Sequence, residues 1–318
     1  MSVRRTDSPR AQKGVALITV LLIVAMLVAI LGRLSFDNQL WLRQTSNAAN
    51  SARVASLTRA AQLWIRTLLD QDDPQVDAAT EMWSRPLPPL PIPGGTLSGQ
   101  IYDRQGRFNL NNLVAANGEP NEIELERFKR LLAVLDLNED LAHAAVDWID
   151  PNTKPFGTFG AEDAYYLAQD PPYLSANRPF HALAEVRLVR GFSLRTWQRL
   201  EPHVAAMPLA TAINVNTASP EVIAAAMTNW GDARAALGRA ERWTNNARTF
   251  PASDLAAFAR EAIGTEQREE LPPGLSVSTR FFSANILISV DGLSDRIVTL
   301  YDRGDGSSAI VSQYRSFR

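Results

Sequence analysis

The chain begins with a continuous apolar segment that is long enough to cross a membrane. From Val15 to Gly32 there is no charged residue, and Thr19 is the one polar side chain. These 18 residues reach the lower limit for spanning a hydrocarbon core of about 30 Å. The residues ahead of the segment are mainly basic, with Asp7 opposed by Arg4, Arg5, Arg10 and Lys13. The positive-inside rule therefore predicts a cytoplasmic N-terminus and an exported remainder.

A secreted protein with a removable signal peptide is the alternative interpretation of this N-terminus. The apolar segment is longer than the roughly 7–15 residues of a signal-peptide core. No small-x-small cleavage site follows it, and residues 33–37 read as a continuation of the helix. We therefore expect an anchor that stays on the mature protein.

The helix is predicted to extend far beyond the membrane. Between Val15 and Asp70 there is no proline and one glycine, Gly32. Small and apolar residues recur at helical spacing on one face, at Ala48, Ala49, Ala52, Ala55, Leu57, Ala60, Leu63, Trp64 and Leu68. Polar residues and Pro74 end the pattern. We expect a helix over 15–70 of roughly 80 Å, transmembrane over about 15–34 and amphipathic after that.

The remainder alternates between strand and helix patterns. Five prolines in 85–95 favour an extended connector. Strands are expected at 97–102 and 107–110, and helices at 120–135, 138–149, 185–190 and 193–203. Ser219 and Pro220 begin another helix, and the strands 281–290 and 295–302 flank a hairpin turn. Two apolar-Asn-apolar-Asn runs, 108–112 and 213–217, each precede a helix, and we expect their asparagines to act as N-caps.

These elements predict an α+β protein whose sheet is interrupted by helices. The expected segments are a basic leader 1–14, the helix 15–70, a Pro-rich connector 71–96, first strands 97–110, an inserted helical domain 111–210, a second small helical segment 211–270 and C-terminal strands 271–318.

Composition excludes several classes of function. The 318 residues have a net charge of −2 and no cysteine, which excludes disulfides, thiolate metal sites and cysteine nucleophiles. No GxSxG, HExxH, Walker or Rossmann pattern occurs in the sequence, so we expect no enzymatic activity. The acidic balance also argues against nucleic acid. A membrane-anchored, periplasmic helix-hairpin-helix protein that receives DNA remains the alternative, because a helix–Gly191–helix pattern lies at 185–203.

One acidic loop offers hard oxygen ligands. Asp150, Asn152, Glu162 and Asp163 surround a stretch rich in proline and glycine. Calcium takes six to eight such oxygens, including backbone carbonyls and water. The loop lacks the EF-hand pattern, and from the residues alone solvated loop acids are the simpler interpretation.

The residues around Gly14 carry a first resemblance. Lys13-Gly14-Val15-Ala16-Leu17-Ile18-Thr19 resembles the prepilin peptidase site of type IV pilins and type II secretion pseudopilins. The resemblance implies cleavage between Gly14 and Val15, with Val15 then N-methylated. The fifth mature residue is usually glutamate, which is thought to pair with the N-terminal amine of a neighbouring subunit. Here it is Thr19, whose hydroxyl can only bond back to the Val15 carbonyl.

Four further stretches resemble the minor pseudopilin K family, also called general secretion pathway protein K. They are Asp103 to Asn111, Asp147 to Asp150, Gly160 to Tyr166 and Ile213 to Ala218. That family also lacks the glutamate at the fifth mature position. The resemblance implies a pilin-like fold, in which a long N-terminal transmembrane helix packs on an antiparallel sheet and a large helical domain is inserted.

The resemblance also implies a function. The chain is expected to be a minor pseudopilin of a type II protein secretion system, in the bacterial inner membrane with a periplasmic C-terminal domain. It would cap the tip of the pseudopilus and help to initiate its assembly. The implied partners are the I- and J-type minor pseudopilins, the prepilin peptidase and the inner-membrane secretion platform, without nucleic acid. Calcium near the acidic loop is implied on the same ground, and the candidate ligands are Asp150, Asn152, Glu162 and Asp163, although the resemblance does not say which of them bind.

Overall fold

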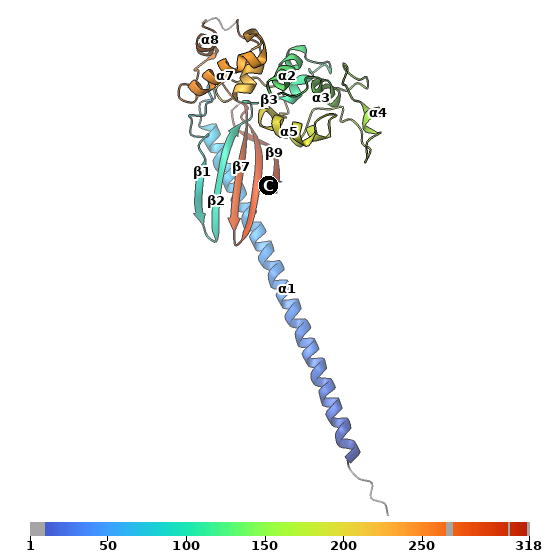
Figure 1. Ribbon diagram of the computed structural model, residues 1–318. Helices are drawn as coiled ribbons and strands as arrows, with labels where there is room; N and C mark the ends of the chain where they lie inside the picture. The colour runs from blue at the N-terminus through green and yellow to red at the C-terminus, as the bar shows by residue number, and fades with distance from the viewer. Residues whose placement is uncertain (1–9, 265–269, 305, 317–318) are drawn as a thin grey trace, which may run out of the picture. The chain divides into compact units, whose positions relative to one another are not determined.

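The computed structural model describes residues 10–264, 270–304 and 306–316, with side chains from Val15 onward. It divides into two compact units, residues 1–57 and 58–318. Helix α1, Arg10–Asp70, contributes to both units (Figure 1). The long helix expected from the sequence is confirmed. Residues 1–9 of the predicted leader lie outside the described residues.

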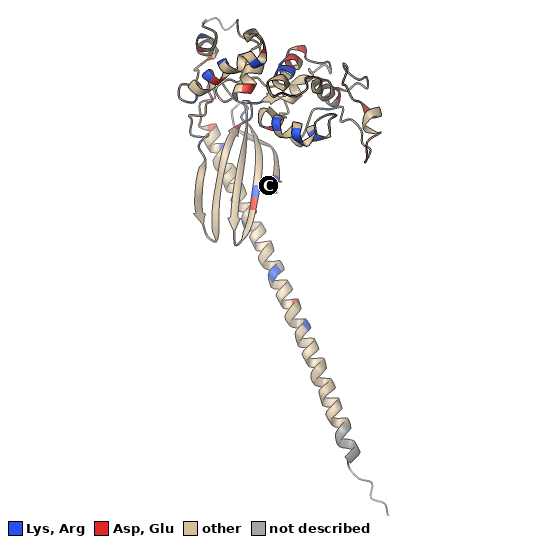
Figure 2. Ribbon diagram, viewed as in Figure 1, with Lys and Arg blue, Asp and Glu red and all other residues tan. Residues whose placement is uncertain are grey.

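The first unit is the apolar part of α1. The side chains from Val15 to Ala49 are exposed, because no other described part of the chain covers them. Few of these positions are charged (Figure 2). Within the described part of the chain, one helix, Val15–Asp70, is long and apolar enough to cross a membrane. The Thr19 hydroxyl donates to the Val15 carbonyl at 2.8 Å, as expected for a hydroxyl one helical turn along.

The second unit contains a five-stranded antiparallel sheet. Its strands are β1 (Leu87–Ile92), β2 (Gly95–Asp103), β7 (Phe281–Val290), β8 (Leu293–Asp302) and β9 (Ala309–Ser316), in that spatial order. The predicted hairpin joins β7 and β8, with Val290 opposite Leu293. Asp291 and Gly292 both have positive φ, 48° and 82°, which is the two-residue turn that suits the strand twist.

The C-terminal part of α1 packs on this sheet. Ile65 and Leu69 are buried. Gln62 donates to the Thr299 hydroxyl at 3.0 Å and to the Gln313 side chain at 2.7 Å, which links the helix to β8 and β9. The amphipathic pattern of this segment therefore has its expected partner.

Two details of the expected strands differ in the structure. Part of the Pro-rich connector forms the edge strand β1, which tolerates Pro88, Pro89 and Pro91 because an edge strand needs ladder donors on one side only. The second early strand does not join the main sheet. It is β3 (Phe108–Asn109), which pairs in parallel with β4 (Val204–Ala205).

A helical region lies between β2 and β7 in the sequence. Its helices are η1 (Leu110–Leu113), α2 (Glu122–Val134), α3 (Leu141–Ile149), α4 (Asp163–Tyr166), η2 (Leu183–Leu188), α5 (Leu194–Leu200), η3 (Glu201–His203), α6 (Pro220–Ala226), η4 (Thr228–Trp230), α7 (Ala233–Ala247) and α8 (Leu255–Ile263). Short strands β5 (Ile213–Asn214) and β6 (Leu275–Ser276) pair in parallel. Ser193 and Ser219 cap α5 and α6 through their side chains, as expected.

The helical region has one core, although the sequence indicated two helical segments that meet near residue 210. Helix α2 packs against both α6 and α7, and a single buried cluster includes Phe108, Phe128, Val222 and Trp243. The rings of Phe108 and Phe128 stack with centroids 5.3 Å apart. This shared core fixes the loop that carries the acidic residues.

Candidate metal centre

The C-terminal end of α3 places two carboxylates in a buried position. Asp147 lies in the last turn and Asp150 is the C-cap residue, and both side chains are buried. Positions three apart share one side of a helix. Asp147 Oδ1 accepts from the Phe156 amide at 2.9 Å, and Asp150 Oδ1 accepts from the Asn152 amide at 3.2 Å. Among the described residues, neither Oδ2 atom has a hydrogen-bond partner.

Glu162 adds a third buried carboxylate. It is the residue before α4, and its backbone is extended. Both of its carboxylate oxygens are buried without a hydrogen-bond partner in the described part of the chain. A buried and unpaired carboxylate is costly unless a proton or a cation neutralises it.

The pKa values show that these carboxylates interact. Burial, together with the charges of Asp147, Asp150 and Asp163, raises the pKa of Glu162 to about 7. Burial also raises the pKa of Asp147 to about 7, with Asp150 adding to the effect and the amides of Phe156 and Ala161 opposing it. The pKa of Asp150 is raised by burial as well. Asp147, Asp150 and Glu162 therefore place negative charges close together, and no basic residue is among the causes of their pKa shifts.

The four predicted ligands do not all lie in this cluster. Asp150 and Glu162 do. Asp163 is half-buried, and its Oδ1 accepts from the Ser175 amide at 2.9 Å. Asn152 is exposed, and its Oδ1 accepts from the Lys154 amide at 2.8 Å. Sequence reasoning missed Asp147 as a candidate ligand, although its spacing from Asp150 on a helix could have identified it.

The backbone at Gly160 packs closely against one of these carboxylates. Gly160 approaches so closely that a Cβ there would meet Asp147 Oδ2 and the backbone of Phe156. The unpartnered oxygens of Asp147, Asp150 and Glu162 are the ligand type that calcium prefers. They come from the end of α3 and from the residue just before α4.

The two asparagine motifs are clamps between distant backbone segments. Asn109 does cap η1, as expected, because its side chain accepts from the Asn111 amide. Asn111 also bonds to residues far away: its Oδ1 accepts from the Phe180 amide at 2.8 Å, and its Nδ2 donates to the Met207 carbonyl at 2.9 Å. The motif therefore connects three parts of the helical region.

The second motif acts in the same way and caps no helix. Asn216 donates to the Ala252 carbonyl at 3.0 Å and accepts from the Ala252 amide at 2.8 Å. Asn214 donates to Asp103 Oδ2 and to the Asp77 carbonyl, both at 3.0 Å. The N-cap prediction is wrong here, since Ser219 caps the following helix.

A family model and several relatives match this chain, and they agree with the family that the sequence motifs resemble. The family model "Type II secretion system (T2SS), protein K" matches residues 106–209. The type II secretion system protein K of Pseudomonas aeruginosa is 37% identical over 230 residues, covering 68% of each chain. That of Aeromonas hydrophila is 30% identical over 327 residues, covering 96% of this chain and 97% of the relative.

The chain belongs to the type II secretion system protein K family. It is thus a minor pseudopilin, as the sequence motifs indicated. The DNA-receptor alternative is not favoured. The fold is similar to a chain in the crystal structure of the GspK-GspI-GspJ complex from enterotoxigenic Escherichia coli, with a TM-score of 0.69 and 21% identity over 87% of this chain and 100% of the other.

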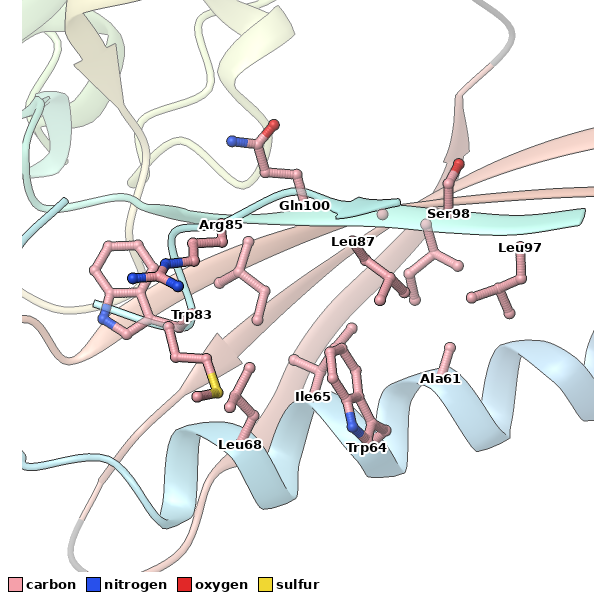
Figure 3. Close-up of a pocket in the computed structure, with 14 residues that line it drawn as sticks. Ala61, Trp64, Ile65, Leu68, Trp83, Arg85, Leu87, Leu97, Ser98 and Gln100 are labelled. Atoms are coloured by element: carbon pink, nitrogen blue, oxygen red, sulfur yellow. The ribbon is translucent and has the colours of Figure 1, made fainter. Parts of the chain in front are cut away.

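In this protein K family member, an apolar groove lies beside the sheet. Ala61, Trp64, Ile65 and Leu68 of α1 form one wall, and Leu87, Leu97 and Ile101 of β1 and β2 form the other (Figure 3). The groove encloses about 50 Å³. At its margin, Trp64 is 49% exposed and Met82 is 70% exposed.

Proposed function

We propose that this minor pseudopilin caps the tip of the periplasmic pseudopilus and helps to initiate its assembly for the export of folded proteins. The observation that carries the proposal is Thr19, whose hydroxyl bonds to Val15 within its own helix. Threonine has no carboxylate to pair with the N-terminal amine of a subunit above, and its hydroxyl is already bonded within its own helix. The helical region inserted between β2 and β7 adds bulk to the head, which would obstruct further stacking.

Position in the fibre tests this proposal. Gold particles directed to a tag on this chain are expected at one end of assembled pseudopili. Thr19→Glu is expected to be tolerated without a gain in assembly, because no subunit lies above it. Thr19→Val is the matched control that removes only the intrahelical bond. Label spaced along the shaft would contradict the tip position.

Maturation by the prepilin peptidase is part of the same proposal. The peptidase would cut on the cytoplasmic side between Gly14 and Val15 and leave Val15 N-methylated. The α1 anchor would remain in the inner membrane, with the C-terminal domain in the periplasm and the secretion platform beside it. The apolar segment of α1 and the basic residues ahead of it support this orientation.

Intact mass measured in cells with and without the peptidase tests the maturation step. The expected mature mass begins at Val15 and includes one methyl group. Gly14→Val should block the cut, because the peptidase must approach the backbone there, whereas Gly32→Val should be processed normally. A chain that begins at Met1 in both strains would refute this step.

Calcium binding by the acidic loop is proposed on the chemistry of its donors. Asp147, Asp150 and Glu162 would hold the ion, and Asp163 would add charge close by. Asn152 is the weakest of the predicted ligands, because its side-chain oxygen already accepts a hydrogen bond from the Lys154 amide in an exposed turn. The ion would supply the positive charge that these buried oxygens lack, and it would stabilise the native state by mass action.

Thermal unfolding of the full chain in detergent, with calcium or with a chelator, tests this site. Calcium at 100 times its Kd is expected to add about 2.7 kcal/mol to the free energy of unfolding. Glu162→Gln should lose most of this response. Glu126→Gln, an exposed position on α2, should keep it. Equal melting temperatures with and without calcium would return these acids to a structural role without metal.

The proposed partners are the I- and J-type minor pseudopilins, which accompany the protein K of Escherichia coli in its crystallised complex. The groove beside α1 is the surface we assign to them. Its margin exposes Trp64 and Met82, and half-exposed aromatic side chains commonly anchor interfaces. The prolines of β1 remove backbone donors from this edge, so the partner would insert apolar side chains rather than add a strand.

Co-purification from membranes tests this surface. Trp64→Ser and Met82→Ser should reduce recovery of the I- and J-type subunits. Phe250→Ser, at an equally exposed apolar position far from the groove in sequence, should not. Undiminished recovery in both groove variants would place the interface elsewhere. The proposed role is structural: the chain would act by assembly, without an enzymatic reaction and without binding nucleic acid.

A further inference from the structure

A second acidic cluster lies where α1 ends and the sheet begins. Asp72 and Glu81 are half-buried, and Asp77 is fully buried. One carboxylate oxygen from each residue lies within 4.8 Å of the other two. The cluster is separate in sequence from the acidic loop at 147–163, and none of its members entered the sequence-based prediction of ligands.

Arg303 neutralises part of the negative charge of this cluster. Its Nη1 lies 3.1 Å from Asp72 Oδ2 and its Nη2 lies 2.5 Å from Asp77 Oδ2. Asp77 Oδ2 also accepts from the Thr279 amide at 2.6 Å. Glu81 Oε2 accepts from the Trp83 indole at 2.5 Å and from the Ala78 amide at 3.2 Å.

One carboxylate oxygen of Asp77 lacks any such partner. Asp77 Oδ1 is buried, and no described residue donates a hydrogen bond to it. The Asp77 carboxylate is one of the three groups that each have an oxygen within 4.8 Å of the other two. A buried carboxylate oxygen without a donor is costly, and this one is positioned among two further carboxylates.

The charge of the cluster also does not balance. Asp72, Asp77 and Glu81 carry three negative charges when ionised, and the ion pairs to Arg303 supply one positive charge. The nearby charge of Asp103 adds to the repulsion. Burial raises the pKa of Asp77 to about 7 even though Arg303 is adjacent. A divalent cation would neutralise the net charge of −2 that these four side chains leave.

We propose that Asp72, Asp77 and Glu81 form a second site for a hard divalent cation of the calcium type, beside Arg303. All three ligands come from the segment that follows α1, whereas Arg303 and Thr279 flank β7 and β8. The cation would therefore hold this segment together, and Arg303 and the Thr279 amide connect the same carboxylates to the sheet. This inference is independent of the site at Asp147, Asp150 and Glu162.

The hydrogen bond between Trp83 and Glu81 supplies a selective probe. Terbium occupies calcium sites, and a nearby indole sensitises its luminescence. The experiment uses the full chain in detergent, in a background with Asp150→Asn and Glu162→Gln. Terbium is expected to give sensitised emission in this background, and calcium is expected to displace it. Because the first site is disabled, failure of that proposal does not alter this measurement.

Glu81→Gln provides the decisive variant, since the amide oxygen can still accept from Trp83 while the charge is lost. We expect its terbium affinity to fall by about 10–100-fold. Glu241→Gln, at an exposed position on α7, should not change it. Trp83→Phe should abolish the emission while radioactive calcium is still retained in equilibrium dialysis.

Two outcomes would overturn the site. One is the absence of retained calcium in the background protein, which would leave the cluster as an ion-pair network neutralised by a proton. The other is equal affinity in Glu81→Gln and Glu241→Gln. Near-ultraviolet circular dichroism verifies folding, and Asp72→Asn provides a second ligand variant if Glu81→Gln is poorly folded. Asp72→Asn is expected to lose affinity in the same way, and unchanged affinity would count against the site.

Discussion

Replacement of Asn216 by alanine should destabilise the helical region strongly. Its buried side chain makes two reciprocal hydrogen bonds to Ala252, at 3.0 Å from its Nδ2 to the carbonyl and at 2.8 Å from the amide to its Oδ1. The substitution leaves the amide and the carbonyl of Ala252 buried without partners. Each unsatisfied buried group costs about 1–3 kcal/mol, so the expected loss is about 2–6 kcal/mol.

The assay is thermal unfolding of the full chain in detergent, followed by near-ultraviolet circular dichroism. For a domain of this size, 1 kcal/mol lowers Tm by about 2–4 °C, so even the smallest expected loss lowers Tm by about 4 °C. Asn245→Ala, on the exposed side of α7, is the matched control and should stay within about 0.5 kcal/mol. Equal melting temperatures for the two variants would refute the clamp and restore a purely local role for Asn216.

Three further variants test other parts of the fold by the same thermal assay. Gly238→Ala should stabilise the protein by about 0.5–1 kcal/mol, because this helical position has open space for a Cβ. Gly106→Ala should destabilise it by about 1–3 kcal/mol, since a Cβ there would lie 2.9 Å from the backbone of Thr217; an unchanged Tm would show that the contact relaxes freely. Arg127→Met should cost about 3–5 kcal/mol by leaving the buried Glu124 carboxylate without its ion pair, and a loss below about 1 kcal/mol would contradict this.

The sequence alone determined the features that depend on neighbouring residues. An apolar segment without charges specifies a part of α1 that is long and apolar enough to cross a membrane, whatever the rest of the chain does. Ser193 and Ser219 specify helix starts because a capping hydroxyl bonds to amides two or three residues away. The Asp291-Gly292 turn specifies the β7–β8 hairpin because these residues accept positive φ.

The two asparagine motifs can be recognised in the sequence, but the sequence does not show which groups their side chains bond. Asn109 fulfils the local prediction because its partner is two residues away. Asn216 does not, because its partner, Ala252, is 36 residues away. No local pattern distinguishes a capping asparagine from one that clamps a distant backbone.

The tertiary structure decided what depends on long-range contacts. It placed the prolines of β1 at a sheet edge. It also paired β3 with β4, although Phe108 and its partner Val204 are remote in sequence. It also buried Asp147 and left Asn152 exposed, which the sequence did not predict. Folding removes water from some carboxylates and leaves others solvated, and that difference in solvation exists only once the core has formed.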